Sequence, residues 1–318
     1  MLYLGVDSGG TKAAFLLTDE TGRVIARHCE PGCTALGSRK AGMKKMLESG
    51  IHEICCKAHI EKEQIAALGL GISGYGEGEH AAEETQEACE EAFFPGRFVC
   101  ALDTYIGWAG SLLFEPGINI IAGTGSVVFG VAEDGRTARA GGWGAGCDEG
   151  SCTWLGQRLI EAYTKQADGR MPRTALYQVF RDHHQILGED EMFVMELNHG
   201  VIRERKGLAK QQYLLRDAWL KGDPVADAIY HAGAEELFLA AKTVANKLSL
   251  AWKGLKVSYS GGLFKAGECA LKPLEEMIHQ AGGLLVKPAC EPDVGAVLMA
   301  IRFHQPDFDV KQFALQEE

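Results

Sequence analysis

The sequence is short of proline and of long apolar segments, and each shortage excludes a class of protein. Nine prolines in 318 residues, without a Gly-X-Y period, exclude a collagen-like chain in spite of 40 glycines. No apolar run approaches the length that spans a bilayer, so we expect no membrane partner. The first residues also lack the basic and apolar segments of a signal peptide, which predicts a cytoplasmic protein.

Basic clusters and cysteine motifs are missing as well. The net charge is −11 with neutral histidines, and no Lys/Arg stripe offers the surface that nucleic acids require, so we expect no nucleic-acid partner. None of the ten cysteines forms a C-x-x-C pair, which is the spacing typical of a zinc site. In a cytoplasmic protein we expect these thiols to be reduced and to lie in the core or in loops.

The chain does contain the composition of a globular protein, with an excess of glycine. Hydrophobic residues make up 46% and charged residues 24%, which excludes wholesale disorder. A length of 318 residues is comfortable for two domains. The 40 glycines exceed the usual share of about 7%. Because they lie among Val, Ile and Leu, they indicate tight turns or close approaches of the backbone to a ligand.

A glycine turn joins two predicted strands within residues 2–18. Asp7 ends the first strand, and the turn that follows contains Gly9, Gly10, Thr11 and Lys12. Glycines let N–H groups approach phosphate oxygens, and a hydroxyl such as that of Thr11 can donate to them. A carboxylate such as Asp7 can hold Mg²⁺ through water. The alternative is an ordinary hairpin with a Gly-Gly turn.

A second pair of predicted strands joined by a glycine turn occurs in the middle of the chain. A strand at 118–122 is followed by a turn and a return strand at 127–131, and the turn contains Gly123, Thr124, Gly125 and Ser126. Two such hairpins predict two similar halves, with a boundary near 113–117, that hold a polyphosphate from both sides. Coincidence between two hairpins is the alternative. Neither turn is a Walker A loop, because G-x-x-x-x-G-K-[ST] is absent.

Two polar residues follow predicted strands at the edge where α/β sheets bind ligands. Asp103 follows the strand at 98–102, and its carboxylate can act as the general base that deprotonates an attacking hydroxyl. The alternative is that Asp103 caps a helix. Ser73 follows the strand at 66–72 and either lines the same cleft or belongs to a plain loop.

The densest glycine segment surrounds Trp143 and ends at Asp148. Trp143 can lie against the apolar face of a sugar, and Asp148 can accept hydrogen bonds from sugar hydroxyls or cap a helix at 149–166. A structural turn with a packed tryptophan is the alternative. Later in the chain, a strand at 257–260 enters Gly261 and Gly262, where a flat adenine or ribose can pack on the backbone.

Other segments complete the expected order of elements. The sequence predicts further helices at 40–60, 223–253 and 293–303, and short strands at 24–26 and 284–286. The stretches 174–187 and 190–204 give mixed signals.

Together these motifs resemble the N-acetylglucosamine kinase branch of the BadF/BadG/BcrA/BcrD ATPase family. The motifs that carry the resemblance are Asp7–Lys12, Gly123–Ser126, Gly141–Gly144 and Cys147–Ser151. In the last of these, Cys147 stands in place of the first glycine of the family's Gly-Asp-Glu-Gly-Ser motif. The resemblance implies an α/β fold of two ribonuclease-H-like domains, as in actin, sugar kinases and Hsp70, with a central nucleotide and sugar cleft. The implied domains are 1–115 and 116–292, with a C-terminal helix at about 293–318 returning to the first. ATP, Mg²⁺ and a homodimer are implied as well.

The resemblance also implies roles for individual residues. Thr11 and Thr124 would contact the phosphates of ATP, and Asp103 would be the base acting on the 6-hydroxyl of an amino sugar. The sugar site would be lined by Ser73, Ser126, Gly142, Trp143, Gly144 and Asp148.

One departure from the family concerns the substrate. Relatives carry an asparagine that contacts the sugar in the loop after the third strand, whereas residues 30–37 of this chain contain none. A bulkier amino sugar such as N-acetylmuramic acid therefore stands beside N-acetylglucosamine and glucosamine as a candidate. Arg39 and Lys40 either reach a lactyl carboxylate or lie on the surface.

Two other functions compete with a sugar kinase. Some family members are ATPases that activate a dehydratase or reductase through an iron–sulfur cluster shared by two subunits, but the cysteine spacings here suggest no clear pair of cluster ligands. A sugar-sensing regulator would need a DNA-binding module. Because the first predicted strand starts at residue 2 and the charge is −11, we expect no such module.

Overall fold

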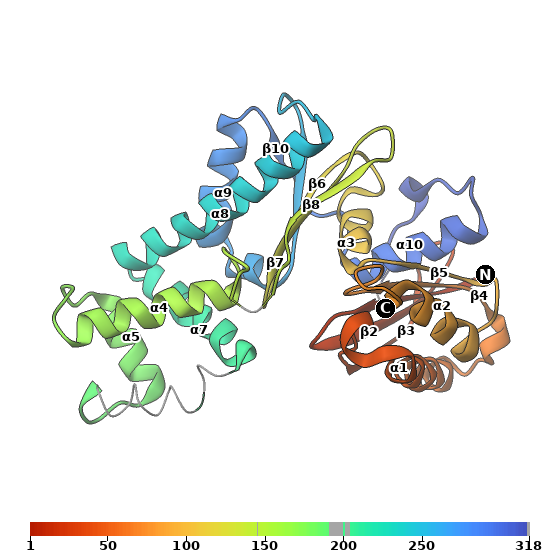
Figure 1. Cartoon of the computed structure of the whole chain (residues 1–318), viewed down its shortest axis with the longest axis horizontal. Coiled ribbons are helices and arrows are strands. Elements are labelled where there is room, and N and C mark those ends of the chain that lie inside the picture. Colours follow the sequence, from red (N-terminus) through yellow and green to blue (C-terminus); the bar gives the residue numbers. More distant parts are fainter. Residues whose placement is uncertain (145, 191–199, 201–203, 317–318) are drawn as a thin grey trace. The chain divides into compact units, whose positions relative to one another are not determined.

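A computed structural model of the chain describes residues 1–144, 146–190, 200 and 204–316. The chain divides into two compact units, Met1–Glu115 with Lys287–Glu318 and Pro116–Val286 (Figure 1). Residues 287–292 thus belong to the first unit rather than to the second. Most of the stretch 190–204 lies outside the described residues. No helix in the described part of the chain has the length and apolarity to cross a membrane.

The first unit is built on a five-stranded sheet with the order β3-β2-β1-β4-β5. Strands β1, β2 and β3 are antiparallel neighbours, whereas β4 and β5 run parallel to β1. Its elements are β1 (Leu2–Ser8), β2 (Lys12–Asp19), β3 (Val24–Pro31), α1 (Ala35–Ala58), β4 (Ile65–Ile72), α2 (Ala81–Ala92), β5 (Phe98–Ala101), α3 (Asp103–Leu112) and α10 (Pro292–His304), with short 3₁₀ turns at Lys62–Gln64 and Val310–Gln312.

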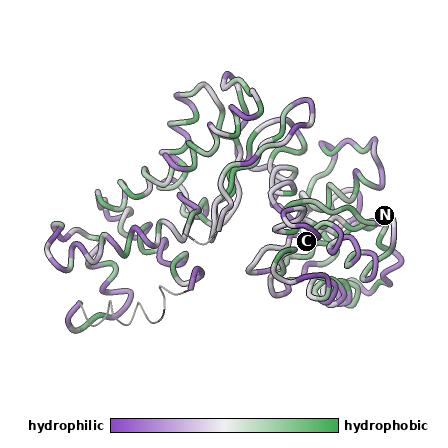
Figure 2. The backbone as a smooth tube through the Cα atoms, in the orientation of Figure 1, coloured by the Kyte–Doolittle hydropathy of each residue, from purple (hydrophilic) through white to green (hydrophobic). Residues whose placement is uncertain are grey.

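Helices cover both faces of this sheet, as the period-2 alternation of β1 requires. Leu4 and Val6 belong to the hydrophobic cluster that includes Met43 of α1. Tyr3, which precedes Leu4 in the strand, belongs to the opposite cluster, which includes Val297 of α10. Figure 2 shows the strands as mainly hydrophobic and the outer helices as alternately hydrophobic and hydrophilic.

Several glycines serve the packing of α10, a role that the sequence analysis did not anticipate. A Cβ atom at Gly5 or Gly69 would lie within 3.0 Å of the backbone of α10, and one at Gly295 would lie within 3.0 Å of the Ile106 carbonyl in α3. These glycines let α10 approach β1, β4 and α3 at backbone distance. Part of the glycine excess therefore reflects helix packing rather than ligand approach.

The second unit repeats the topology of the first. Its sheet has the order β10-β9-β6-β7-β8, in which β6, β7 and β8 are antiparallel neighbours and β9 and β10 run parallel to β6. The duplication predicted from the two glycine hairpins is therefore confirmed, and both units have the ribonuclease-H-like arrangement. The elements are β6 (Gly117–Ala122), β7 (Ser126–Val131), β8 (Thr137–Gly141), α4 (Cys152–Ala167), α5 (Ala175–His184), α7 (Arg205–Trp219), α8 (Pro224–Leu248), β9 (Lys256–Ser260), a 3₁₀ turn at Gly262–Ala266, α9 (Glu268–Gln280) and β10 (Leu284–Leu285).

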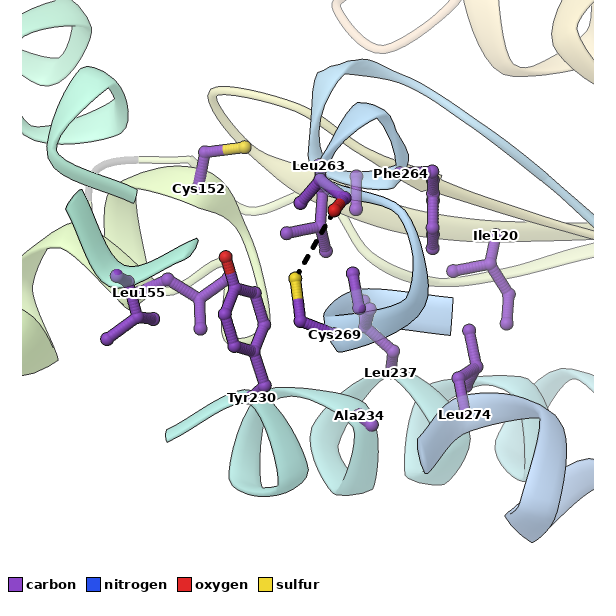
Figure 3. Packing of buried hydrophobic residues seen from close by; sticks show 14 of the residues in the cluster. Ile120, Cys152, Leu155, Tyr230, Ala234, Leu237, Leu263, Phe264, Cys269 and Leu274 are labelled. Atoms are coloured by element: carbon purple, nitrogen blue, oxygen red, sulfur yellow. Dashed lines mark hydrogen bonds between the residues drawn. The ribbon is translucent and has the colours of Figure 1, made fainter. Parts of the chain in front are cut away.

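The core of the second unit lies between its sheet and its helices. Figure 3 shows Tyr230 of α8 beside Leu155 of α4, with Leu237 of α8, Leu274 of α9 and Ile120 of β6 in the same cluster. Each of these side chains is almost fully buried, and burial of one such apolar side chain stabilises the fold by about 1.5–3 kcal/mol. This core fixes the ends of β6 and α4, which border the second glycine turn.

Several element boundaries differ from the prediction. Helix α1 has a kink at Arg39, whose φ of 53° and ψ of 173° are not helical, so its long part starts near residue 40 as predicted. A short first turn precedes the kink, and the Thr34 hydroxyl caps it by accepting the Gly37 N–H. Helix α8 ends at Leu248 rather than near 253, because Ser249 adopts a left-handed conformation and its N–H bonds back to the helix. Helices α2 and α7 and strand β8 were not predicted. The buried residues of α2 are small (alanine, threonine and cysteine), so its hydrophobic periodicity is weak.

Candidate active site

Three predicted site residues come together at the carboxyl ends of β1 and β4. They are Asp7, Ser73 and Asp103. The Ser73 N–H donates to the Ser8 carbonyl over 2.9 Å, which joins the ends of these two strands. Asp103 is the first residue of α3, with Leu102 at the capping position, so the interpretation of Asp103 as the helix cap is wrong. Its carboxylate accepts the Thr104 N–H at 2.9 Å and a hydrogen bond from the Ser73 hydroxyl.

Carboxylates dominate the electrostatics of this edge. Burial raises the pKa of Asp103 above its usual range, and the hydrogen bonds from Thr104 and Ser73 offset part of that effect. Burial raises the pKa of Asp7 to about 7, with further increases from the negative charges of Asp103 and Asp293. Ionising Asp7 is therefore costly in the protein alone, and a bound cation would remove that cost.

A single carboxylate such as Asp7 suits Mg²⁺ better than it suits a metal ion whose ligands are all protein side chains. Among the described residues, no group of three or more His, Cys, Asp and Glu side chains is placed to hold an ion. Mg²⁺ often binds through one or two carboxylates together with water and substrate phosphates, rather than in an all-protein cage. Asp7 beside the first glycine turn meets that description.

The first glycine turn rests on Gly32, a residue that the sequence analysis missed. The Gly9 N–H donates to the Lys12 carbonyl over 3.0 Å and closes the turn between β1 and β2. A Cβ atom at Gly32 would lie within 3.0 Å of the Gly9 carbonyl oxygen and the Thr11 nitrogen. Gly10, Thr11 and Lys12 are exposed, so the turn presents polar groups to a ligand. The dipeptide Pro31-Gly32 in the loop was the available signal.

Arg39 and Lys40 are engaged with α2. The Arg39 guanidinium lies 3.2 Å from Glu84, and the Lys40 ammonium lies 2.8 Å from Glu87 and 2.6 Å from Glu91. These contacts favour the interpretation of both residues as surface charges over recognition of a lactyl carboxylate.

The second glycine turn is fixed by the start of α4. The Gly123 N–H donates to the Gly125 carbonyl over 2.8 Å, and the Gly123 carbonyl accepts the Cys152 N–H at 2.8 Å. The Thr124 carbonyl accepts the Thr153 hydroxyl at 2.6 Å. The turn thus lies against the first residues of a helix, where the helix dipole favours an anion.

Gly261 and Gly262 lie beside this turn. Gly261 has a φ of +104°, and a Cβ atom there would lie within 3.0 Å of the Ala122 carbonyl. The Gly262 nitrogen is 3.8 Å from the position of a Cβ on Gly123. The predicted nucleotide residues of the second unit are therefore neighbours, and Gly261 has the close approach to β6 that only glycine permits.

The loop around Trp143 is tied to the same turn. The Gly142 N–H donates to the Ser126 carbonyl over 2.9 Å, and the Ser126 hydroxyl donates to the Glu149 carbonyl over 2.6 Å. The Trp143 side chain is 78% exposed, which rules out the alternative of a packed structural tryptophan. Its ring is accessible to a ligand.

Asp148 is buried and does not cap a helix. Helix α4 begins at Cys152 rather than at 149, and Ser151 caps it by accepting the Trp154 N–H, so the predicted capping role of Asp148 is wrong. The Asp148 carboxylate instead accepts the Gly144 N–H at 2.8 Å and lies 3.2 Å from the guanidinium of Arg205. Sequence reasoning missed Arg205, which lies at the end of a stretch without clear periodicity.

Two cavities adjoin these residues in the second unit. One of about 490 Å³ is lined by Asp148, Arg205 and Thr153, and one of about 210 Å³ is lined by Ser126, Gly141 and Trp143. Glu149 and Glu236 line both. The larger volume is within the range of small-molecule sites. Of the predicted sugar residues, Ser126, Trp143 and Asp148 thus line one of these two cavities.

Known proteins match this chain over most of its length. The sequence profile of the BadF/BadG/BcrA/BcrD ATPase family matches residues 4–300. A curated relative, the N-acetylmuramic acid/N-acetylglucosamine kinase of Clostridium acetobutylicum, is 28% identical over 261 residues, covering 82% of this chain and 84% of the relative. The N-acetyl-D-glucosamine kinase of Dictyostelium discoideum is 24% identical, covering 94% of this chain and 98% of the relative.

Solved structures share the fold. A protein of Chromobacterium violaceum, provisionally named an N-acetylglucosamine kinase, aligns with a TM-score of 0.73 and 27% identity, covering 94% of this chain and 98% of that one. A ROK family glucokinase from Streptomyces griseus, solved with glucose and AMPPNP, aligns with a TM-score of 0.57 and 19% identity, covering 94% and 98%. The second likeness supports the fold alone.

Proposed function

Because the chain belongs to the BadF/BadG/BcrA/BcrD ATPase family, we propose that it is an ATP-dependent kinase that phosphorylates the 6-hydroxyl of an amino sugar. N-acetylglucosamine is the first candidate substrate, with N-acetylmuramic acid and glucosamine beside it. The curated relatives named for the first two sugars support this choice over an iron–sulfur ATPase that activates a dehydratase or reductase.

One structural observation carries the proposal: the two units place a glycine turn at the same point of the same topology. The turn between β1 and β2 and the turn between β6 and β7 each follow the central strand of a five-stranded sheet. Both turns offer backbone N–H groups and a threonine, Thr11 or Thr124, to the phosphates of ATP. Gly261 and Gly262 beside the second turn would contact the nucleoside.

Asp103 would act as the general base. Its raised pKa makes it a stronger base than a solvated aspartate. The proton of the sugar 6-hydroxyl would pass to the Asp103 carboxylate as the oxygen attacks the γ-phosphorus and ADP leaves. Mg²⁺, held by Asp7 through water, would supply charge neutralisation at the phosphates.

Most of the residues proposed to hold the sugar belong to the second unit. The exposed Trp143 offers an aromatic face, and Asp148 offers acceptor oxygens to sugar hydroxyls. Ser73, Ser126, Gly142 and Gly144 would complete the site. A homodimer in the cytoplasm is part of the same proposal, and it rests on the family resemblance.

The direct test is an ADP-release screen over glucose, glucosamine, N-acetylglucosamine, N-acetylmannosamine and N-acetylmuramic acid, with a no-sugar control. We expect ADP release well above the control with at least one N-acetylated amino sugar, and a 6-phosphate product by mass spectrometry and NMR. Equal ADP release with and without sugar would contradict the proposal and favour an ATPase. Iron–sulfur absorbance in anaerobically purified protein would point to the activator class.

A further inference from the structure

The Asp148 carboxylate is held by a small set of contacts. Its side chain is 6% exposed, so its negative charge needs partners inside the protein. One oxygen accepts the Gly144 N–H at 2.8 Å, and the other lies 3.2 Å from Nη2 of Arg205. A Cβ atom at Gly125 would lie within 3.0 Å of that second oxygen, so the carboxylate lies directly against the second glycine turn.

Arg205 is itself anchored to this turn. It is the first residue of α7, and its carbonyl lies 3.4 Å from the Thr153 hydroxyl, which donates to the Thr124 carbonyl over 2.6 Å. Its Nη2 atom lies 3.3 Å from the position of a Cβ on Gly125. Arg205 therefore contacts Asp148 with its side chain and the neighbourhood of the phosphate turn with its backbone.

We propose that Arg205 is a positioning residue for the sugar: its guanidinium holds the Asp148 carboxylate in place to accept sugar hydroxyls. The inference rests on the proposed function. A carboxylate has about four acceptor sites, of which Gly144 and Arg205 occupy two and leave the others for the substrate. The Arg205 side chain is 46% exposed, so it remains beside the larger cavity rather than deep in the core.

Loss of Arg205 should weaken sugar binding selectively. Among the described residues, the Asp148 charge would keep only the Gly144 N–H as a partner, and it would turn toward water, away from the substrate. In Arg205→Gln we expect the KM for the amino sugar to rise about 10- to 100-fold, the range for one charge-assisted hydrogen bond, with the KM for ATP unchanged. Arg205→Lys should recover part of the loss because it keeps the charge.

Arg170→Gln is the matched control. Arg170 lies in the same unit and forms an ion pair with Asp168 at 2.7 Å on the surface, away from the glycine turns. This variant should keep both KM values. Thermal melts with and without nucleotide show whether each variant is folded, and Arg205→Lys carries the test should Arg205→Gln fail to fold.

A double-mutant cycle separates positioning from a merely structural role. Once Asp148→Asn has removed the carboxylate charge, the further change Arg205→Gln should leave the sugar KM unaltered. An unchanged sugar KM in Arg205→Gln, or an equally large increase in the Asp148→Asn background, would overturn the inference while leaving the kinase intact. Absence of turnover by the wild-type protein on every amino sugar would instead contradict the proposed function, and the inference with it.

Discussion

At the scale of single residues, the site depends on carboxylates in environments that oppose their charge. Asp7 and Asp103 lie at one sheet edge, where burial raises the pKa of both and the negative charge of Asp103 raises the pKa of Asp7 further. Asp148 in the second unit has instead an arginine partner. This division fits a chemistry in which Asp7 receives a cation, Asp103 receives a proton and Asp148 receives hydrogen bonds.

Replacement of Asp7 should lower the activity of the protein and raise its stability at neutral to basic pH. The pKa of Asp7 in the folded protein is about 7, above its unfolded value of 3.8, so the folded state binds more protons between these values. The contribution of the protonated Asp7 carboxyl to the free energy of unfolding is complete below pH 4, and it is lost as the pH rises through 7. Asp7→Asn should therefore be more stable than the metal-free wild type at pH 8, by up to about 4 kcal/mol, and nearly equal at pH 4.

Thermal or urea unfolding of both proteins at pH 4 and pH 8, without Mg²⁺ and nucleotide, measures this difference. The variant should also lose Mg²⁺-dependent turnover. A variant that is less stable than the wild type at pH 8 would show that the Asp7 charge is not the cost that its surroundings suggest.

The pH profile of activity should reflect the ionisation of the Asp103 carboxyl. A base with a raised pKa must lose its proton before it can act, so kcat/KM for the sugar should fall as the pH decreases through a midpoint above 3.8. The Ser73 hydroxyl lowers this pKa by its hydrogen bond, so Ser73→Ala should move the midpoint to higher pH. The comparison is made at saturating Mg²⁺ and ATP. A midpoint that is the same in both proteins would argue that Asp103 is not the titrating base.

At the scale of elements, sequence reasoning succeeded where local chemistry decides the structure. Glycine turns between apolar strands signalled both hairpins, and the two turns then indicated the duplicated topology. It failed where tertiary contacts decide. Helix α2 consists mainly of small and acidic residues, and its packing against α1 decides which of them are buried. The position of Arg205 beside Asp148 depends on the packing of α7 against α4. Neither contact leaves a local signal.

The first glycine turn gives an element-scale prediction. In Gly32→Ala the new Cβ would collide with backbone atoms of Gly9 and Thr11, which cannot move without displacing the turn. We expect a loss of stability of about 1–3 kcal/mol and a higher KM for ATP. Gly188→Ala is the control, since a Cβ at Gly188 meets no atom of the described residues within 4 Å. Equal behaviour of the two variants in melts and nucleotide titrations would remove Gly32 from the nucleotide site.

At the scale of the whole molecule, the proposal divides one reaction between two units of like topology. The first unit carries the predicted base, the metal carboxylate and Ser73, and the second carries the other predicted sugar residues together with Gly261 and Gly262. The resemblance of short motifs to a family was sufficient to predict the fold class, because those motifs lie at the turns that define the topology. Substrate identity was not predictable, since the cavity walls come from elements that are distant in the sequence.

The central claim is that Asp103 deprotonates the 6-hydroxyl of an amino sugar bound together with ATP. The most direct measurement compares wild type and Asp103→Asn in single-turnover phosphoryl transfer from labelled ATP, with nucleotide affinity measured in parallel. The account predicts that Asp103→Asn binds ATP as tightly as the wild type and loses transfer by at least about 100-fold, the range for a general base. Near-normal transfer with intact nucleotide binding would contradict it.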